Sequence, residues 1–181
     1  MANYGNLTNG AAPNEQGGYK NALYFSEIPD ITTGQRPTAA GVTIGDTLAI
    51  AVAHTWAAGK TVNTWETKIG TVQHLTETGG DVGAKELIHI VRAEILGDSA
   101  AILEQLNRLL NDNTVFWLKD ANCLIANAYY QLGDDCNPVS ATVNFDSQTN
   151  NPEQVNGQKR YVLELRTKAK FYYTAALDFT P

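Results

Sequence analysis

Polar and apolar residues alternate along most of the chain between residues 20 and 179. A period of two is typical of strands that bury one face, and Val, Ile, Thr, Tyr and Phe, which favour strands, are frequent in these segments. Gly70 predicts a bulge or a break inside one of them. The segments predicted as strands are residues 21–28, 46–56, 61–78, 85–96, 114–120, 123–133, 140–147 and the long terminal segment 160–179.

The alternation is imperfect in residues 85–96, which have some resemblance to a helix. Val91 falls on one side of this segment and Ile90 on the other, and we favour a strand because the period of two fits better than 3.6. Residues 46–56 have small residues between larger apolar ones, so we expect a single strand with one buried face. That face would carry Leu48, Ile50 and Val52.

A helix is predicted at about residues 99–111, where the spacing of apolar residues changes to that of one helical face. Asp98 or Ser99 can cap its first turn, because their side-chain oxygens accept free amide protons there. The Asn-rich run at 111–113 ends it. The predicted apolar stripe consists of Ile102, Leu103, Leu106, Leu109 and Leu110.

These elements predict a mainly β fold, an antiparallel β-sandwich or barrel with one α-helix and an extended N-terminal arm. Residues 1–19 are rich in Asn, Gly, Ala and Pro and are expected to form a flexible arm, whereas residues 20–181 form a single domain. Turn residues at 133–135 and 156–157 predict hairpins. One helix cannot cover both faces of a sheet, so the sheet must fold on itself or be covered by other subunits.

The charge balance argues against a protein that binds nucleic acid tightly. The formal net charge is -6 and the sequence pI is about 5.0, whereas such proteins neutralise phosphates with clustered Lys and Arg. The basic residues that crowd near the end of the chain alternate with apolar ones and are interpreted as the solvated face of a strand. No apolar stretch approaches the roughly 20 residues of a membrane span. No secretory signal is recognised either, so we expect synthesis in a cytoplasm, with Cys123 and Cys136 as free, partly buried thiols.

No set of residues predicts an enzyme, and we expect no catalytic residue, cofactor or metal. The run AAGKT at residues 57–61 lacks the first glycine of a phosphate-binding loop, since His54 stands there. His54, His74 and His89 lie on separate predicted strands, without the local spacing of a zinc site. Asp134 and Asp135 fit turn chemistry better than a calcium loop.

Aromatic residues provide the main functional signal. Adjacent residues of a strand point to opposite faces, so the pairs Tyr129–Tyr130 and Tyr172–Tyr173 place a ring on both faces of their strands. A sheet with rings on both faces is expected to be covered twice, once by its own core and once by another copy. The predicted subunit-interface residues are Tyr24, Phe25, Tyr129, Tyr130, Phe171, Tyr172 and Tyr173.

The order of these segments resembles that of structural proteins of tailed bacteriophages, above all tail-tube and neck-ring subunits. The resemblance rests on the polar arm, the GGYKNALYFSEIPDI strand, the GDSAAILEQLNRLL helix, the VFWLKDANC segment and the closing NGQKRYVLELRTKAKFYYTAAL. It implies a virion protein that forms homo-oligomeric rings, commonly of six copies, stacked through loops and arms. It also implies that strands of neighbouring copies join into an inner barrel through which DNA passes without specific binding.

Other functions remain open at this stage. A neck ring, a fibre or a capsid decoration protein would use the same self-assembling surfaces, together with other virion proteins as partners. A carbohydrate-binding β-sandwich is a further alternative, in which Trp56 or Trp65 stacks on a sugar ring.

Overall fold

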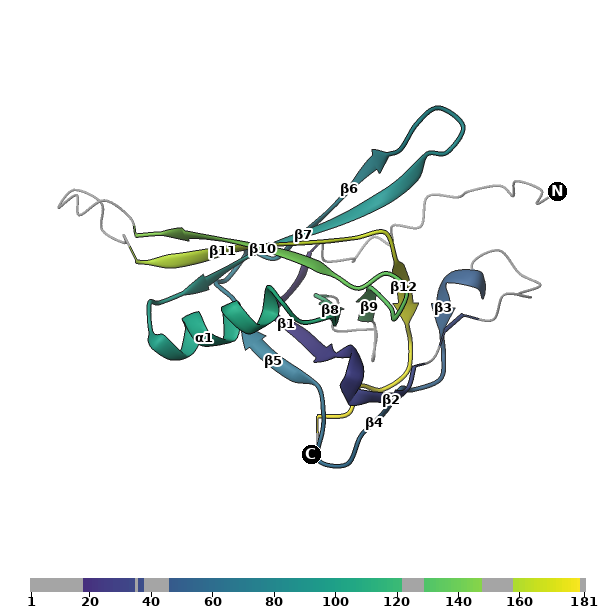
Figure 1. Cartoon of the computed structure of the whole chain (residues 1–181), viewed down its shortest axis with the longest axis horizontal. Coiled ribbons are helices and arrows are strands. Elements are labelled where there is room, and N and C mark those ends of the chain that lie inside the picture. The colour runs from purple at the N-terminus through teal and green to yellow at the C-terminus, as the bar shows by residue number, and fades with distance from the viewer. Residues whose placement is uncertain (1–17, 35, 38–45, 122–128, 148–157, 180–181) are drawn as a thin grey trace.

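The structure is a computed structural model that describes residues 18–34, 36–37, 46–121, 129–147 and 158–179 (Figure 1). It is mainly β with one α-helix and several sheets, as predicted. The helix is α1 (Ala100–Leu109) and the two 3-10 turns are η1 (Ile28–Asp30) and η2 (Asp46–Leu48). The strands are β1 (Tyr19–Glu27), β2 (Ile31–Thr33), β3 (Ala49–Ile50), β4 (Thr55–Trp56), β5 (Asn63–Glu66), β6 (Gln73–Gly79), β7 (Glu86–Leu96), β8 (Thr114–Asp120), β9 (Tyr129–Leu132), β10 (Ser140–Asp146), β11 (Arg160–Thr167) and β12 (Lys170–Tyr173).

The strands form two main sheets that pack as a sandwich. One sheet has six strands in the order β3-β12-β9-β8-β1-β5, and the other has four in the order β10-β11-β7-β6. β2 and β4 form a small separate pair. β12 runs parallel to β3, and the other pairings between the described strands are antiparallel. The first core lies between the two main sheets, with Phe116 and Leu118 from one sheet and Leu163 and Leu165 from the other.

A second core covers the opposite face of the six-stranded sheet. Alternation along β8 sends Phe116 into the first core and Trp117 into the second, where Trp117 meets Tyr173. The cover consists of the chain's own segments, among them Ile50 and Leu177. The chain therefore covers both faces of this sheet itself, which differs from the expectation that a second copy must cover one of them.

Helix α1 begins where the sequence predicts. The Oγ of Ser99 accepts a hydrogen bond from the backbone N–H of Ile102 at 3.3 Å, which caps the first turn. Leu106 and Leu109 are buried, whereas Leu103 is 47% exposed. The buried stripe is thus narrower than predicted, because the helix lies at one end of the sandwich and packs along one side only (Figure 1).

Two predicted strands are divided. Residues 46–56 form η2, β3 and β4 instead of one strand, and Val52 in the gap is 62% exposed. The terminal segment forms β11 in the four-stranded sheet and β12 in the six-stranded sheet. The chain changes sheet around Ala169, whose carbonyl accepts a hydrogen bond from the N–H of Gly133 at 2.9 Å.

The turn predictions have mixed outcomes. Gly70 has a φ of 75° in the turn between β5 and β6, so the predicted break is confirmed. Asp134 accepts hydrogen bonds from the backbone N–H groups of Cys136 and Asn137. The strands on either side of this turn, β9 and β10, belong to different sheets, so the predicted hairpin is wrong there. The turn predicted at 156–157, and residues 1–17 of the predicted arm, lie outside the described residues; Tyr19 already belongs to β1.

Candidate subunit interface

Three of the predicted interface residues are buried by the chain itself. Phe25 is 8% exposed and belongs to the first core, whereas Tyr129 is 6% and Tyr173 0% exposed in the second core. The sequence correctly predicted that rings lie on opposite faces of the sheet, but the chain's own residues cover both faces. In this conformation these three rings are core residues and offer no surface to another copy.

Tyr24 and Phe171 are partly buried at the edge of the second core. The ring of Tyr24 lies edge-on to Tyr129, with 5.8 Å between centroids, and edge-on to Phe179 at 5.5 Å. Burial raises the pKa of the Tyr24 phenol, with a further contribution from Tyr129. The C-terminal segment therefore covers part of this ring, and a smaller part remains for contact with another molecule.

Tyr130 and Tyr172 lie together with Tyr19 on the other side of the sheet. The centroid of Tyr130 is 5.6 Å from that of Tyr19 and 5.3 Å from that of Tyr172, which is 49% exposed. The Nζ of Lys170 is 4.8 Å from the Tyr130 centroid and 5.5 Å from that of Tyr172, within cation–π range. We call Tyr19, Tyr130, Tyr172 and Lys170 the tyrosine cluster.

Two histidines face the tyrosine cluster from the four-stranded sheet. The Nε2 of His74 is 3.1 Å from the Nδ1 of His89, and the Tyr19 hydroxyl is 3.2 Å from the Nδ1 of His74. Burial, followed by the charge of Lys170, lowers the pKa of His74 to about 4, and the same causes lower the pKa of His89. The pair is therefore neutral near pH 7 and connects the two sheets by hydrogen bonds.

The third histidine lies apart from this pair. His54 is buried in the second core, where its Nε2 is 2.6 Å from the Oε1 of Gln131. Among the described residues, Asp134, Asp135 and Cys136 are the one group of three potential metal ligands within 4.8 Å of one another. Arg36 forms ion pairs with both of these carboxylates, so the group is already neutralised in part. Cys136 is an exposed free thiol, not the partly buried one expected.

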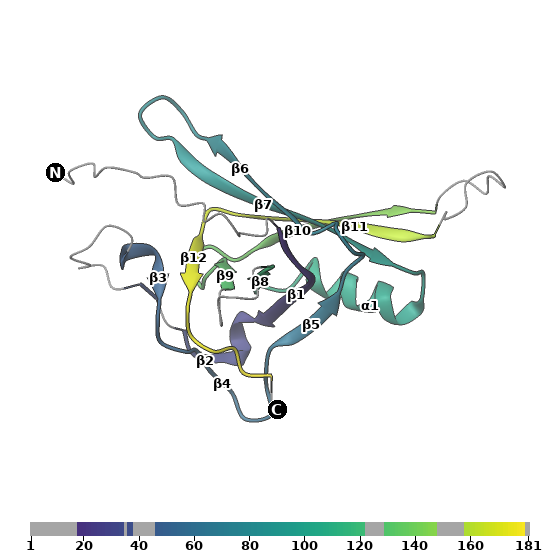
Figure 2. The same cartoon turned by 180° about the vertical axis from the view of Figure 1, so that it is seen from behind.

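The hairpin formed by β6 and β7 projects beyond the sandwich (Figures 1 and 2). Residues 80–87 at its far end are all exposed, including Val82 at 97% and Leu87 at 55%. A two-stranded ribbon without further cover is marginally stable in water. This feature was not predicted from the sequence, since β7 becomes the longest described strand, at 11 residues, only because the structure divides the longer predicted segments.

The outer face of the four-stranded sheet carries alternating charges. Arg92 Nε lies 2.8 Å from Glu164, and Arg160 lies 3.1 Å from Glu94. We call these the outer-face ion pairs, formed by the cations Lys68, Arg92, Arg160, Arg166 and Lys168 with the anions Glu77, Glu86, Glu94, Asp146 and Glu164. Several of the basic residues near the end of the chain therefore form ion pairs with carboxylates of the same face. Because the positive and negative charges balance, this face is nearly neutral.

Both edges of this sheet are open within the described part of the chain. β6 and β10 are its outermost strands, and no described strand pairs with their outer sides. Open edges present unpaired N–H and C=O groups, to which a strand of another molecule can bind.

Comparison of the chain with protein-family models, with curated proteins and with solved structures finds no match. Within the described ranges, no helix has the length and apolarity required to cross a membrane.

Proposed function

We propose that this chain is a structural subunit of a phage tail tube, which self-assembles into stacked rings around a DNA conduit. The observation that carries the proposal is the four-stranded sheet, with an open strand at each edge and a hairpin that extends past its own sandwich. Since the chain covers both faces of its other sheet, assembly would depend mainly on these open edges and on this hairpin.

Assembly would proceed by edge-to-edge pairing. β6 of one copy pairs with β10 of the next, and such a head-to-tail contact generates a closed ring when the rotation between copies closes. Each copy then contributes four strands to a continuous barrel. The pairing removes open edges that would otherwise permit uncontrolled aggregation.

The outer-face ion pairs suit the lining of a DNA conduit. Each of their cations already has a carboxylate within 4.0 Å, so a passing phosphate gains little by displacing it. The overall charge of -6 adds a weak repulsion at long range. DNA would therefore slide past this face without binding to it.

The projecting hairpin supplies the contact between copies or between rings. Val82 and Leu87 are 97% and 55% exposed, and a neighbouring copy would cover them. A neck ring, a fibre or a decoration protein would use the same surfaces. Particle shape distinguishes them, because a tube gives hollow stacks whereas a fibre gives solid rods and a decoration protein isolated knobs.

Electron microscopy and sedimentation of the purified full-length chain test the proposal. We expect rings or hollow tubes, and we expect Val82→Glu to raise the concentration needed for assembly about tenfold, because it places a charge in an apolar contact. Val52→Glu is the matched control, since Val52 is 62% exposed but lies outside the hairpin and the sheet edges. A chain that stays monomeric at high concentration contradicts the proposal.

A further inference from the structure

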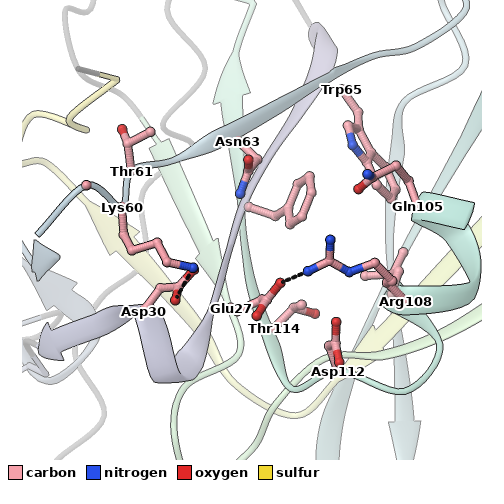
Figure 3. Close-up of a pocket in the computed structure, with 13 residues that line it drawn as sticks. Glu27, Asp30, Lys60, Thr61, Asn63, Trp65, Gln105, Arg108, Asp112 and Thr114 are labelled. Atoms are coloured by element: carbon pink, nitrogen blue, oxygen red, sulfur yellow. Dashed lines mark hydrogen bonds and ion pairs between the residues drawn. The ribbon is translucent and has the colours of Figure 1, made fainter. Parts of the chain in front are cut away.

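A pocket of about 260 Å³ lies between α1, β5 and the end of β1 (Figure 3). Its apolar part consists of Phe25, Trp65 and Leu109, and the rings of Phe25 and Trp65 meet edge-on with 4.6 Å between centroids. Polar side chains line the rest of it. Ligands of drug size occupy pockets of roughly 300–1,000 Å³, so this one suits a smaller molecule.

A buried hydroxyl group in the wall has no partner. Thr114 is 1% exposed and lines the pocket, and its Oγ1 forms no hydrogen bond with any described residue. Leaving a buried hydroxyl unsatisfied is unfavourable, and most buried polar atoms in proteins are paired. The Oγ1 itself is fully buried, so a ligand in the pocket cannot reach it, and other polar groups of the wall have to provide the hydrogen bonds to a ligand.

The charged groups of the pocket largely satisfy one another. Arg108 on α1 lies 3.2 Å from Glu27 on β1, and Lys60 lies 2.9 Å from Asp30 (Figure 3). The carboxylate of Asp112 is the remaining formal charge among the lining residues. A pocket with this balance repels an anion such as phosphate, and the Asp112 carboxylate can accept hydrogen bonds from hydroxyl groups of a ligand.

Further polar groups in the pocket are available to a ligand. The side-chain amides of Asn63 and Gln105 and the indole N–H of Trp65 form no hydrogen bond within the described part of the chain. Together with the Asp112 carboxylate they present both donors and acceptors. The apolar rings beside them suit a ligand with one apolar face and several hydroxyls.

We propose that this pocket binds a single neutral sugar residue, whose hydroxyls pair with Asn63, Gln105 and Asp112 while its C–H face lies against Trp65. The proposal goes beyond assembly, because the pocket lies beside the helix, away from the projecting hairpin and from the two open edges of the four-stranded sheet. Trp56 takes no part: it packs against the second core and donates its indole N–H to the Ser26 Oγ at 3.2 Å.

The test is ligand-observed NMR titration of the full-length chain with glucose, galactose, mannose and N-acetylglucosamine, each also as its methyl glycosides. We expect saturable millimolar binding of at least one neutral sugar. Binding of a methyl glycoside assigns the pocket to a sugar unit of a glycan, whereas binding of the free sugar alone assigns it to a free monosaccharide. Preference for inorganic phosphate, or no saturable sugar binding, overturns the proposal.

Variants locate the binding. Asn63→Ala and Gln105→Ala should each weaken it by roughly threefold to tenfold, since each removes one hydrogen bond. Thr114→Val should leave the affinity unchanged and should leave thermal stability unchanged or raise it, because it removes a buried, unpaired hydroxyl without a change of shape. Asn107→Ala is the matched control on the same helix, outside the pocket. Unchanged affinity in both pocket variants overturns the assignment.

Discussion

His74 joins the two layers at the point where the projecting hairpin leaves the sandwich. It contacts Tyr19 on the six-stranded sheet and His89 on the adjacent strand β7. Burial and the nearby Lys170 ammonium keep its imidazole neutral near pH 7. Tyr130 and Asp120 complete the surroundings on the opposite sheet, where the Tyr130 hydroxyl donates to the Asp120 carboxylate at 3.2 Å. Protonation of His74 would therefore place a positive charge next to the Lys170 ammonium, in a site that is partly shielded from water.

The pH dependence of stability follows from this site. The pKa of His74 is about 4 in the folded chain against an ordinary value of 6.5, so the unfolded chain takes up the proton first. Its contribution to stability is fully present above pH 6.5 and is lost as the pH falls toward 4. We expect a loss on the order of 1 kcal/mol after allowance for solvent screening.

Urea unfolding measures this loss at neutral and at acidic pH. His74→Gln should make the stability curve flatter in this window than that of the wild type, while carboxylate titrations affect both proteins equally. Parallel curves for the two proteins would exclude His74 as the titrating group.

The buried face of α1 depends on Leu106, which is 2% exposed. Leu106→Asp places a carboxylate in the core and should lower the free energy of unfolding by about 3–5 kcal/mol, enough to unfold much of the chain. Leu103→Asp on the same helix is the control: Leu103 is 47% exposed, and its substitution should cost under about 1 kcal/mol. Circular dichroism with denaturant measures both. Equal losses would contradict the observed packing of the helix.

At the scale of elements, the four-stranded sheet combines an apolar inner face with a charged outer face. Val91 and Leu163 point into the first core, while their neighbours Arg92 and Glu164 pair on the outside. Exposed ion pairs stabilise a fold little, so their regular arrangement has more effect on the electrostatic potential of the face than on its stability.

Removing carboxylates from this face should create affinity for DNA. Glu94 and Glu164 pair with Lys68, Arg92 and other cations of the outer face. The double variant Glu94→Gln, Glu164→Gln should bind duplex DNA with a strong salt dependence, because the released cations can contact phosphates. Fluorescence anisotropy at low and moderate salt measures this binding.

A second double variant separates local charge from net charge. Glu66→Gln with Glu104→Gln removes the same number of carboxylates from exposed positions outside this face. It should remain without measurable affinity. Equal DNA binding by both variants would mean that net charge, and not the outer-face ion pairs, keeps DNA from binding.

At the scale of the whole molecule, the second core makes a single copy a complete folding unit. The segment after β12 places Ala175 and Leu177 against the six-stranded sheet, where Ile50 and Val62 join them. The aromatic rings are thus sheltered within one copy. In the proposed assembly, contacts between copies would therefore use the edges of the four-stranded sheet and the projecting hairpin.

The N-terminal residues should matter for assembly and not for folding. Gly18 is the first described residue with a hydrogen bond to the rest of the fold: its carbonyl accepts one from the N–H of Ala121 at 3.1 Å. The first strand, β1, starts at the next residue, Tyr19. Removing residues 1–17 should leave the unfolding midpoint unchanged within about 0.5 kcal/mol and impair the formation of rings or tubes. Normal assembly of the truncated chain, seen by electron microscopy, would show that this segment has no role in it.

The elements with strong local signals were predictable from the sequence. Ser99 and the apolar spacing after it predicted α1, and alternation predicted β1, β7 and β8, because capping and side-chain period are properties of neighbouring residues. The same alternation correctly indicated that β9 and β12 carry rings on both faces. These features, together with the mainly β class and one helix, required no knowledge of distant contacts.

Only the tertiary structure decided what covers each face. Ile50, Trp56 and Leu177 come from segments predicted as long strands that the structure divides, and they reach the second core through contacts between residues far apart in the chain. For the same reason the sequence did not show that His74 and His89 meet, that Thr114 lines a pocket, or that the terminal segment changes sheet at Ala169. Periodicity specifies that a face is apolar, whereas the segment that buries it depends on how the whole chain packs.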